Sequence, residues 1–550
     1  MSYIPPGVTV TEVQQTLSPV LNPPDLVPVV IAPAYIVNQI QNSYGTIYPL
    51  YTNSPVVITI SGLTGYALDN SSVYVDLVVT PGLNSQAPLG RYIVSGISSI
   101  GNTVTIPGNQ LPVTASGFAQ IQIGFRALRY DVSQLYEYQS VSDVIELLDD
   151  TSSFNPLGLA VSTAMANSNS PVFGYGVMAD EFAYSNPTPS GNVLANHQTA
   201  LQYLAMQEIY AIAPATVQSD VISAYDSAVD SLSQPVEKKE RIVFVAPTIP
   251  WSDPVNPQNN TSTTAATISA NAGAYADFRV FYVHPDTAFT YESRHVTTLS
   301  PTYVLKMYEN GFSTTPYAYL AQSVTFSSSN AVTQYQGVTL TPIPGKGIKI
   351  TQQLWLALLS QAQLTGNAWY YAYIPVPSCV LLTPAIVGQV AGQTPEQGLT
   401  NLPIASVDHI KYSSDWFTES QLNTIASGGV FIMKQATETA PIVCRHQLST
   451  DRSSIQKQEL SITKVVDYTA KYVRNTATPY IGKYNITPAV LSFLSTVIKG
   501  VGADEVKKGI LNSFTLSSLT QDTIQLDTVN AYINIGPPYP VNHISIYLIF

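Results

Sequence analysis

The chain has 550 residues, more than one hydrophobic core can organise, and about 150 residues per domain predicts three or four domains. Only 11% of the residues are charged and 45% are hydrophobic, a composition that excludes intrinsic disorder. Few charges and many neutral polar residues favour surfaces that pack against other copies of the chain, because neutral groups cost less to dehydrate. An ordinary β-rich globular protein has a similar composition. The net charge of −12 opposes binding to nucleic acid.

The sequence carries no signal for export, membrane insertion or disulfide formation. Its start lacks the basic and apolar regions of a signal peptide, and no apolar stretch is long enough to span about 30 Å of hydrocarbon. The only cysteines, Cys379 and Cys444, lie 65 positions apart and form no zinc-binding pattern. We therefore expect the chain to fold in a reducing cytosol.

Residues 1–43 are predicted to form an extended arm followed by the first strand of a core domain. The arm is rich in proline, and within it Val8, Val10 and Val13 belong to a short alternating run that reads as a lone strand. A lone strand must pair with a sheet elsewhere. Residues 44–130 are predicted to form an inserted β-rich domain, an outer decoration with short strands between turn residues at 56–60, 73–79, 92–94, 104–106 and 119–123.

Residues 131–250 are predicted to form an α/β middle domain, because helical patterns alternate with an apolar strand at 241–246. The expected helices cover 141–148, 157–166, 193–209 and 217–232. Residues 251–368 are predicted to form a second insertion rich in strands and loops. Its first part, 251–272, reads as a loop, and a strand is expected at 278–283.

Residues 369–550 are predicted to form a C-terminal core domain that ends in a linking strand. One helix is expected from a cap at Asp415 to the glycine pair Gly428-Gly429, and another begins at Thr487-Pro488. The latter is expected to end near Gly500 and Gly502. Between these two helices, a further helix is predicted, with one apolar face formed by Ile462, Val465, Val466, Tyr472 and Val473. Two closing strands are predicted at 528–535 and 543–550.

No pattern for catalysis, cofactor binding or metal binding is visible, so we expect no enzyme activity and no cofactor. The six histidines are scattered without metal-ligand spacing, and Gly345-Lys346-Gly347 lacks the remaining residues of a phosphate-binding loop. No nucleophile, base and orienting residue can be grouped.

The segment 434–508 is locally basic, with 11 Lys or Arg against 6 Asp or Glu. Either its helices have solvated basic faces, or a basic face meets an acidic neighbour. The candidate residues for the second interpretation are Arg474, Lys483, Lys499, Lys507 and Lys508.

Several motifs, in the same order, resemble the contractile tail sheath protein family of bacteriophages. The chain opens with Pro6-Gly-Val-Thr-Val-Thr-Glu12, and its last third contains Ser420-Gln-Leu-Asn-Thr-Ile425, Val443-Cys-Arg-His-Gln-Leu-Ser-Thr450 and Pro540-Val-Asn-His-Ile-Ser-Ile546. The resemblance covers about 1–40, 141–250 and 369–550. It departs from the family pattern at Cys444, where a small or aromatic residue is more usual.

This resemblance implies a mixed α+β multidomain fold, in which an α/β sheath core built from both termini carries inserted β-rich domains. It also implies a virion structural protein that forms a helical homopolymer of hexameric rings around a tail tube protein and contacts baseplate and tail terminator proteins. Such a sheath folds and assembles in the host bacterial cytoplasm, without nucleic acid or membrane insertion, and contracts to drive the tube through the host envelope. The alternative is a β-rich virion adhesin or tail fibre component, which should show internal repeats.

The two orphan terminal strands fit a sheath without reference to the family, because strands added to a neighbouring subunit satisfy backbone groups that are otherwise unpaired. The predicted intersubunit residues are Val8, Val10, Val13, Ile544, Ile546, Leu548 and Phe550.

Overall fold

The computed structural model divides the chain into two compact units. Unit 1 contains residues 1–25 and 464–550, and unit 2 contains residues 26–463. The structure describes residues 21, 23–34, 36–41, 48–49, 56–59, 66–78, 90–93, 98–100, 103–106, 118–129, 134–148, 156–177, 191–248, 264–287, 292–299, 319–320, 334–335, 338–339, 341–343, 347–349, 370–376, 378–407, 410, 417–437, 440–542 and 544–546.

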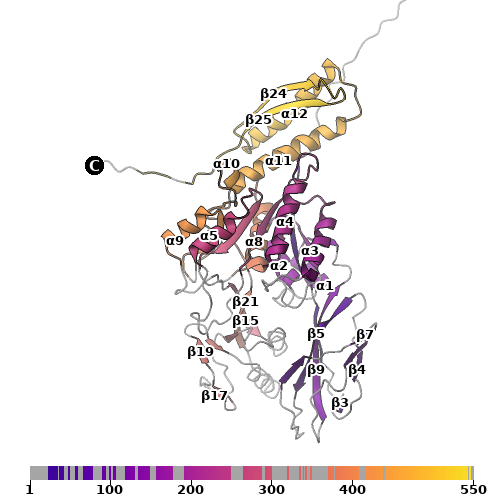
Figure 1. Ribbon diagram of the computed structural model, residues 1–550, viewed down its shortest axis with the longest axis vertical. Helices are drawn as coiled ribbons and strands as arrows, with labels where there is room; N and C mark the ends of the chain where they lie inside the picture. Colours follow the sequence, from indigo (N-terminus) through magenta and orange to yellow (C-terminus); the bar gives the residue numbers. More distant parts are fainter. Residues whose placement is uncertain are drawn as a thin grey trace, which may run out of the picture. The chain divides into compact units, whose positions relative to one another are not determined.

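Unit 2 is built on an eight-stranded sheet that joins segments from both halves of the sequence (Figure 1). Its order is β10 (Leu135–Tyr138), β11 (Val172–Val177), β1 (Pro28–Pro33), β12 (Ala211–Pro214), β13 (Ile242–Val245), β14 (Val280–Pro285), β22 (Val430–Gln435) and β23 (Ile442–Cys444). The six inner strands are parallel, and the two edge strands are antiparallel to their neighbours. Parallel strands are buried on both faces, which explains the continuous apolar runs in their sequences.

Helices cover both faces of this sheet. One face packs against α1 (Val141–Leu148), α2 (Pro156–Met165) and α8 (Ser378–Gly392), and the other against α3 (Gly191–Leu204), α4 (Ser219–Leu232), α5 (Ala265–Gly273) and α9 (Glu419–Ser427). Strand β1 shows the alternation, because Val30 and Ala32 belong to the first core and Val29 and Ile31 to the second. The expected mixed α/β core that draws on both ends of the chain is therefore confirmed.

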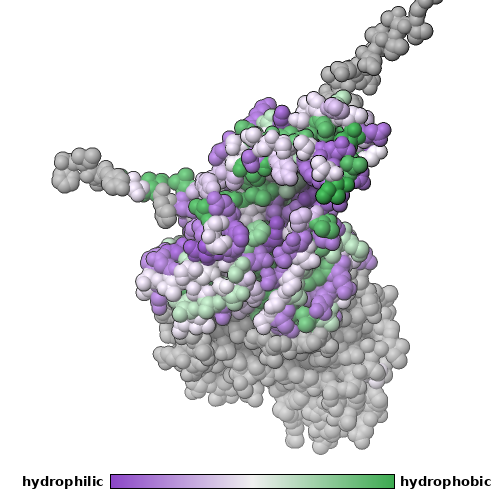
Figure 2. Space-filling view, turned by 45° about the horizontal axis from the view of Figure 1, so that its top comes forward, coloured by the Kyte–Doolittle hydropathy of each residue, from purple (hydrophilic) through white to green (hydrophobic). Residues whose placement is uncertain are grey.

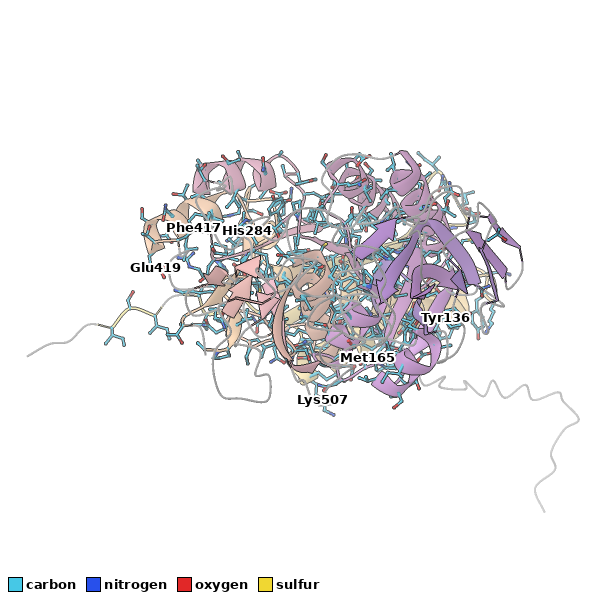
Figure 3. All side chains as sticks on the ribbon, turned by 90° about the horizontal axis from the view of Figure 1, so that it is seen from below. Tyr136, Met165, His284, Phe417, Glu419 and Lys507 are labelled. Carbon is cyan, nitrogen blue, oxygen red and sulfur yellow. The ribbon has the colours of Figure 1, made fainter. Side chains whose placement is uncertain are left out.

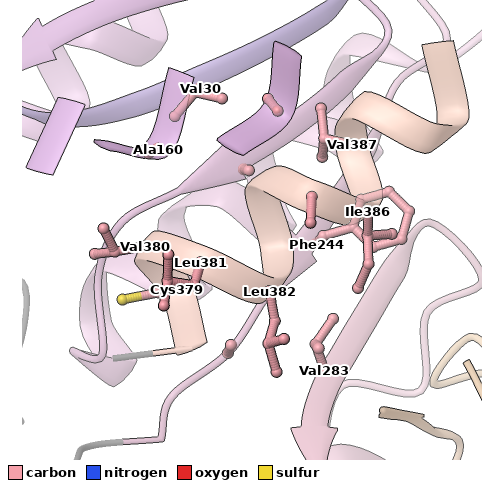
Figure 4. Packing of buried hydrophobic residues seen from close by; sticks show 14 of the residues in the cluster. Val30, Ala160, Phe244, Val283, Cys379, Val380, Leu381, Leu382, Ile386 and Val387 are labelled. Carbon is pink, nitrogen blue, oxygen red and sulfur yellow. The ribbon is translucent and has the colours of Figure 1, made fainter. Parts of the chain in front are cut away.

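Helix α8 lies at the centre of the first core, with nearly every side chain buried (Figure 4). It approaches α2 so closely that a Cβ atom added at Gly388 would overlap the carbonyl group of Ala164. Only glycine permits this backbone contact. In the described residues, no helix combines the length and the hydropathy that crossing a membrane requires.

Two inserted β-rich segments of unit 2 leave its eight-stranded sheet at the carboxyl edge. The first follows β1 and returns at β10; its five-stranded sheet contains β2 (Ile36–Gln41), β3 (Tyr48–Pro49), β9 (Phe118–Arg129), β5 (Tyr66–Val78) and β6 (Gly90–Ile93), and a three-stranded sheet contains β4 (Val56–Thr59), β8 (Thr103–Ile106) and β7 (Ser98–Ile100). Strands β4, β5, β6, β8 and β9 overlap the five predicted runs, whereas β2, β3 and β7 were not predicted. The first sheet starts at β2, before residue 44.

The second insertion follows β14 and returns at α8. It contains the sheet β15 (Glu292–Leu299), β21 (Tyr370–Val376), β16 (Tyr319–Leu320), β20 (Gly347–Lys349) and β19 (Thr341–Ile343), and the pair β17 (Gln334–Tyr335) and β18 (Val338–Thr339). The predicted loop over 251–272 is wrong at its end, because α5 begins at Ala265, where the Thr264 hydroxyl accepts a hydrogen bond from the backbone N–H of Thr267.

The predicted helix over 193–209 is also too long. Helix α3 ends at Leu204. The following residues turn toward the sheet, where the backbone N–H groups of Tyr210 and Ala211 donate to the carbonyl of Val27 beside β1. Tertiary pairing therefore replaced the helical continuation that the apolar pattern indicated.

The C-terminal segment starts with the short helix α10 (Ile455–Gln458) and α11 (Leu460–Ala477), whose residues from 464 onward belong to unit 1. Unit 1 continues through the 3-10 helix η4 (Thr478–Tyr480), α12 (Pro488–Lys508), β24 (Ser513–Gln521) and β25 (Val529–Gly536). The cap predicted for α12 is confirmed, since the Thr487 hydroxyl accepts from the backbone N–H of Val490. The predicted end is wrong, because α12 continues to Gly509, whose φ of 78° stops it.

Candidate assembly interface

Unit 1 presents a two-stranded antiparallel sheet, and no other described strand pairs with it. Strands β24 and β25 pair from Ser513 with Gly536 to Gln521 with Val529, and β24 packs on α12, where a Cβ atom at Gly502 would overlap the ring of Phe514. Two strands alone are marginally stable in water, so α12 must support the hairpin. Among the described residues, each strand has one edge without a partner strand, and such an edge is a template for a further strand.

The two edges differ. The pairing shifts between Leu516 and Ser518, leaving Ser517 as a bulge in β24, and the side chain of Asn534 donates to the Ser517 hydroxyl at 2.9 Å. A bulge twists and interrupts a strand edge. Strand β25 carries no such extra residue, so its free edge is the more regular template.

The hairpin is ordered by its own turn. The Asp522 carboxylate accepts hydrogen bonds from the backbone N–H groups of Ile524 and Gln525 and from the Asn530 side chain. These bonds stabilise the charged form and lower the pKa of Asp522. The turn thus holds Ile524 and Leu526, whose exposed fractions are 89% and 67%, in solvent.

After β25 the chain continues as an extended tail that ends the described part of unit 1 (Figure 1). The tail residues Ile544 and Ile546 are each 79% exposed, and residues 544–546 form no strand. In the described residues, eleven of the sixteen exposed large hydrophobic side chains lie in 464–546, and Figure 2 shows hydrophobic residues on this unit and along the tail. Exposed apolar side chains in such numbers indicate an interaction surface.

The remaining predicted strand residues, Val8, Val10, Val13, Leu548 and Phe550, lie outside the described residues. The closing strand predicted at 528–535 is confirmed as β25, but its partner β24 was missed. The alternation of β24, Ser-Phe-Thr-Leu-Ser-Ser-Leu-Thr-Gln, could have revealed it, although the bulge breaks the period of two.

The core of unit 1 contains a buried carboxyl group between α11 and α12. Glu505 is fully buried, its Oε1 accepts a hydrogen bond from the Thr469 hydroxyl at 2.9 Å, and its Oε2 has no hydrogen-bond partner. Burial raises the pKa of Glu505 to about 7, and the Thr469 bond opposes that rise. The carboxyl group is therefore divided between its neutral and charged forms near neutral pH.

The adjacent residue Asp504 behaves oppositely. Burial disfavours its charge, but hydrogen bonds from Lys508 at 2.7 Å and from the Tyr472 hydroxyl at 2.8 Å outweigh this and lower the pKa of Asp504.

Tyr472 belongs to the predicted buried face of α11. Val466 was also assigned to that face, wrongly, because 42% of it is exposed.

The five candidate basic residues lie on α11, on α12 and in the loop between them. Arg474 lies two residues after Tyr472, whose hydroxyl contacts Asp504 in the second half of α12, and this half also carries the exposed Lys499, Lys507 and Lys508. The exposed Lys483 lies in the loop, next to Tyr484, whose ring contacts Phe493 in the first half of α12. Lys464 and Lys471, counted in the same basic segment, are buried.

The predicted cap residue Asp415 lies outside the described residues, and the helix that it was to begin starts later in the chain. Thr418 caps α9 in a reciprocal capping box with Gln421, and α9 ends at the predicted glycine pair. The first helical residue is Glu419, which Figure 3 labels. Its carboxylate pairs with the side chain of Lys434 at 2.5 Å and with that of Arg445 at 3.2 Å.

The titratable side chains of unit 2 with shifted pKa values include two histidines and the carboxyl pair Asp226 and Asp277, in which burial raises both pKa values, that of Asp226 to about 6. Burial lowers the pKa of His197 and of His284 to about 4, which makes both neutral. His197 contacts the Tyr225 hydroxyl at 3.0 Å. Both cysteines are buried, and no group of three His, Cys, Asp or Glu in the described residues could hold a metal ion.

Comparison with known proteins gave matches only among solved structures. No protein-family model and no curated protein matches the sequence. The helical sheath of the anti-feeding prophage in its contracted state is 10% identical, covers 99% of this chain and 98% of its own, and has a TM-score of 0.48.

The contracted PVC sheath of an extracellular contractile injection system is 8% identical, with 100% of this chain and 98% of that chain covered and a TM-score of 0.45. A sheath tail protein from Desulfitobacterium hafniense is 8% identical, with 97% and 100% covered and a TM-score of 0.39. All three are sheath proteins by their names, and the motifs of this chain resemble the tail sheath family.

Proposed function

We propose that the chain is a structural subunit of a contractile phage tail sheath, which polymerises helically around a tail tube and contracts to drive the tube through the host envelope. The observation that carries the proposal is the β24–β25 hairpin, a sheet with unpaired edges that is followed by an exposed apolar tail. The unpaired edge of the hairpin can accept a strand, and the apolar tail can supply one. A chain in which these two parts do not pair with each other is suited to exchange strands with copies of itself.

The hairpin of one subunit is the acceptor, and the terminal strands 8–13 and 543–550 of neighbouring subunits are the donors. Each backbone hydrogen bond formed across such a joint contributes about 1 kcal/mol net, and burying one isoleucine side chain contributes about 2 kcal/mol. Ile544 and Ile546, both exposed in the single chain, would together contribute several kcal/mol. Strands of this length can therefore hold subunits together.

Strand joints at the ends of the chain would persist while the subunit bodies move. A tail that contains three prolines between Gly536 and Val541 acts as a semi-rigid spacer that connects the joint to unit 1. Contraction is then a change in body-to-body contacts within a lattice that stays connected.

The partners that follow are other copies in stacked hexameric rings, the tail tube, the baseplate and the tail terminator. The exposed cationic side chains of α12 and of the loop before it, with Arg474 of α11, would face an acidic tube or subunit. We place the protein in the virion tail after assembly in the bacterial cytoplasm, as a non-enzymatic component without cofactor, nucleic acid or membrane insertion. The described core is a doubly wound α/β sheet, which does not favour a repetitive tail fibre.

The test removes residues 541–550 and follows assembly of the purified protein by light scattering and negative-stain electron microscopy. We expect the full chain to form striated tubes and the truncated chain to stay folded and unpolymerised. As a matched control, Val236, which is 83% exposed in the loop after α4, is changed to Asp alongside Ile544→Asp. Regular contractile tubes from the truncated chain, or equal loss of assembly in both substitutions, would contradict the strand joint.

A further inference from the structure

A contact between two carboxyl groups joins helix α4 of unit 2 to the turn between α5 and β14. Asp226 lies on α4 and Asp277 in the turn, just before β14 begins at Val280, and the two side chains are hydrogen-bonded to each other. Both residues are half-buried. A carboxylate has only acceptor oxygens, so two carboxyl groups form such a bond only when one of them carries a proton. A single proton therefore decides whether this contact exists.

The turn fixes Asp277 as the acceptor of the bond. Its Oδ1 accepts a hydrogen bond from the backbone N–H of Arg279 at 2.7 Å, which favours the charged form of this carboxyl group. Its backbone N–H donates to the Thr450 hydroxyl at 3.0 Å, and that hydroxyl donates to its carbonyl at 2.7 Å. The proton therefore belongs to Asp226, which donates to Asp277.

The groups around the pair disfavour a second negative charge. Burial is the largest cause, and it raises the pKa of Asp226 to about 6 and that of Asp277 as well. Asp230, one turn further along α4, acts on both carboxyl groups as a like charge, and the Tyr275 hydroxyl faces Asp226 from the turn. Among the described residues, the cation that acts on Asp277 is Arg279.

The turn also contains a strained residue that its neighbours hold in place. Ala276 has a φ of 47°, a left-handed conformation that residues with a Cβ atom rarely adopt. Contacts on both sides restrain it, because the ring of Tyr275 lies against Tyr282 of β14 and Thr450 holds Asp277. Loss of the contact to α4 removes one of these restraints, so ionisation of the pair favours an open turn.

We infer that Asp226 and Asp277 form a proton-dependent clasp, which fastens the α5–β14 turn to α4 at acidic pH and loosens it as the pH rises toward neutral. This device goes beyond the proposed strand joints and does not depend on them, because all of its groups belong to unit 2. The clasp also acts on the segment 449–451, which holds the turn through Thr450 and leads into α10 and α11.

The direction and size of the effect follow from proton linkage. An acid whose pKa is higher in the closed turn than in the open one binds more protons when the turn is closed. Closure should therefore weaken between about pH 4 and pH 6 and stay level above that range. The shift from 3.8 to about 6 sets an upper limit of about a hundredfold on the change in the opening equilibrium. Solvent screens a half-exposed pair, so we expect about tenfold.

The test measures amide hydrogen exchange of the full-length chain at pH 4.5 and pH 7.5, with each rate divided by the intrinsic rate at that pH. Peptides over 274–280 report the turn, and peptides over β13 report the core sheet. In the unchanged chain, the turn should lose about tenfold of its protection at the higher pH, whereas β13 should keep its own.

Two substitutions replace the shared proton by an amide N–H group that is present at every pH. Asp226→Asn donates to the Asp277 carboxylate, and Asp277→Asn donates to the Asp226 carboxylate while its oxygen still accepts from Arg279. Each variant should keep the turn protected at pH 7.5, a gain that loss of a merely structural contact would not produce. Glu237→Gln, in the exposed loop after α4, is the matched control and should behave like the unchanged chain.

Two results would overturn the clasp. One is a turn in the unchanged chain that is equally protected at both pH values, a measurement that needs no variant. The other is a loss of protection at pH 7.5 that is as large in both asparagine variants as in the unchanged chain. If one substitution disturbs the fold, which lost protection of β13 would reveal, the other substitution and the pH profile of the unchanged chain decide.

Discussion

The buried carboxyl group of Glu505 makes the stability of unit 1 dependent on pH, and the substitution Glu505→Gln should remove that dependence. The pKa of Glu505 is raised from 4.5 to about 7 by burial between α11 and α12. The charged groups around it are Asp504 and Lys508 of its own helix, and Tyr472 and the Thr469 hydroxyl face it from α11. An acid with a raised pKa loses stability as pH increases from its unfolded pKa to its folded pKa.

The free energy of unfolding should therefore fall between about pH 4.5 and pH 7 and stay level above that range. Each pKa unit corresponds to 1.36 kcal/mol, so the shift from 4.5 to about 7 gives an upper figure of about 3 kcal/mol. Glutamine cannot ionise and keeps an oxygen for the Thr469 hydroxyl, but it buries an amide N–H group that costs about 1 kcal/mol. We expect Glu505→Gln to stabilise unit 1 by about 2 kcal/mol at pH 8 and not at pH 4.5.

The assay is urea unfolding at pH 4.5 and pH 8, read by pulsed hydrogen exchange at one fixed labelling pH and followed in peptides from α12. The control is Glu237→Gln at an exposed site of unit 2, which should leave both curves unchanged. If Glu505→Gln loses as much stability between the two pH values as the unchanged chain does, the carboxyl group is not the source of the pH dependence.

Three further outcomes follow from the structure. Replacing the first insertion by a short Gly/Ser linker from Ala34 to Gln134 should leave tube assembly intact, because both ends lie at the carboxyl edge of the core sheet; lost assembly of a folded protein would contradict this. Changing all three lysines of α12 to glutamate should weaken assembly on tubes most at low salt, since screened surface pairs contribute only about 0 to 1 kcal/mol each; unchanged assembly at low salt would indicate solvated faces. Gly388→Val should destabilise unit 2 by about 3 kcal/mol or more by forcing α2 and α8 apart, which thermal unfolding measures; an unchanged melting temperature would refute the close contact.

Local signals in the sequence were enough to predict many of the elements. The helix over 141–148, the Thr487-Pro488 start of α12 and the strands of the first insertion follow from caps, turn residues and periodicity, which act within a few residues. The same signals identified a strand at 528–535 and an apolar end of the chain. Both belong to the candidate interface.

Where tertiary packing and a local sequence signal favoured different structures, tertiary packing decided which structure formed. Gly500 and Gly502 indicate a helix end, yet α12 continues through them, because Gly502 leaves the space that Phe514 of β24 occupies. Strand β24 was missed because its bulge at Ser517 breaks the alternation, and the buried position of Glu505 depends on α11 packing beside α12. The position of Arg474 beside the lysines of α12 follows from the packing of the end of α11 against the second half of α12, which no pattern of charges along the chain records.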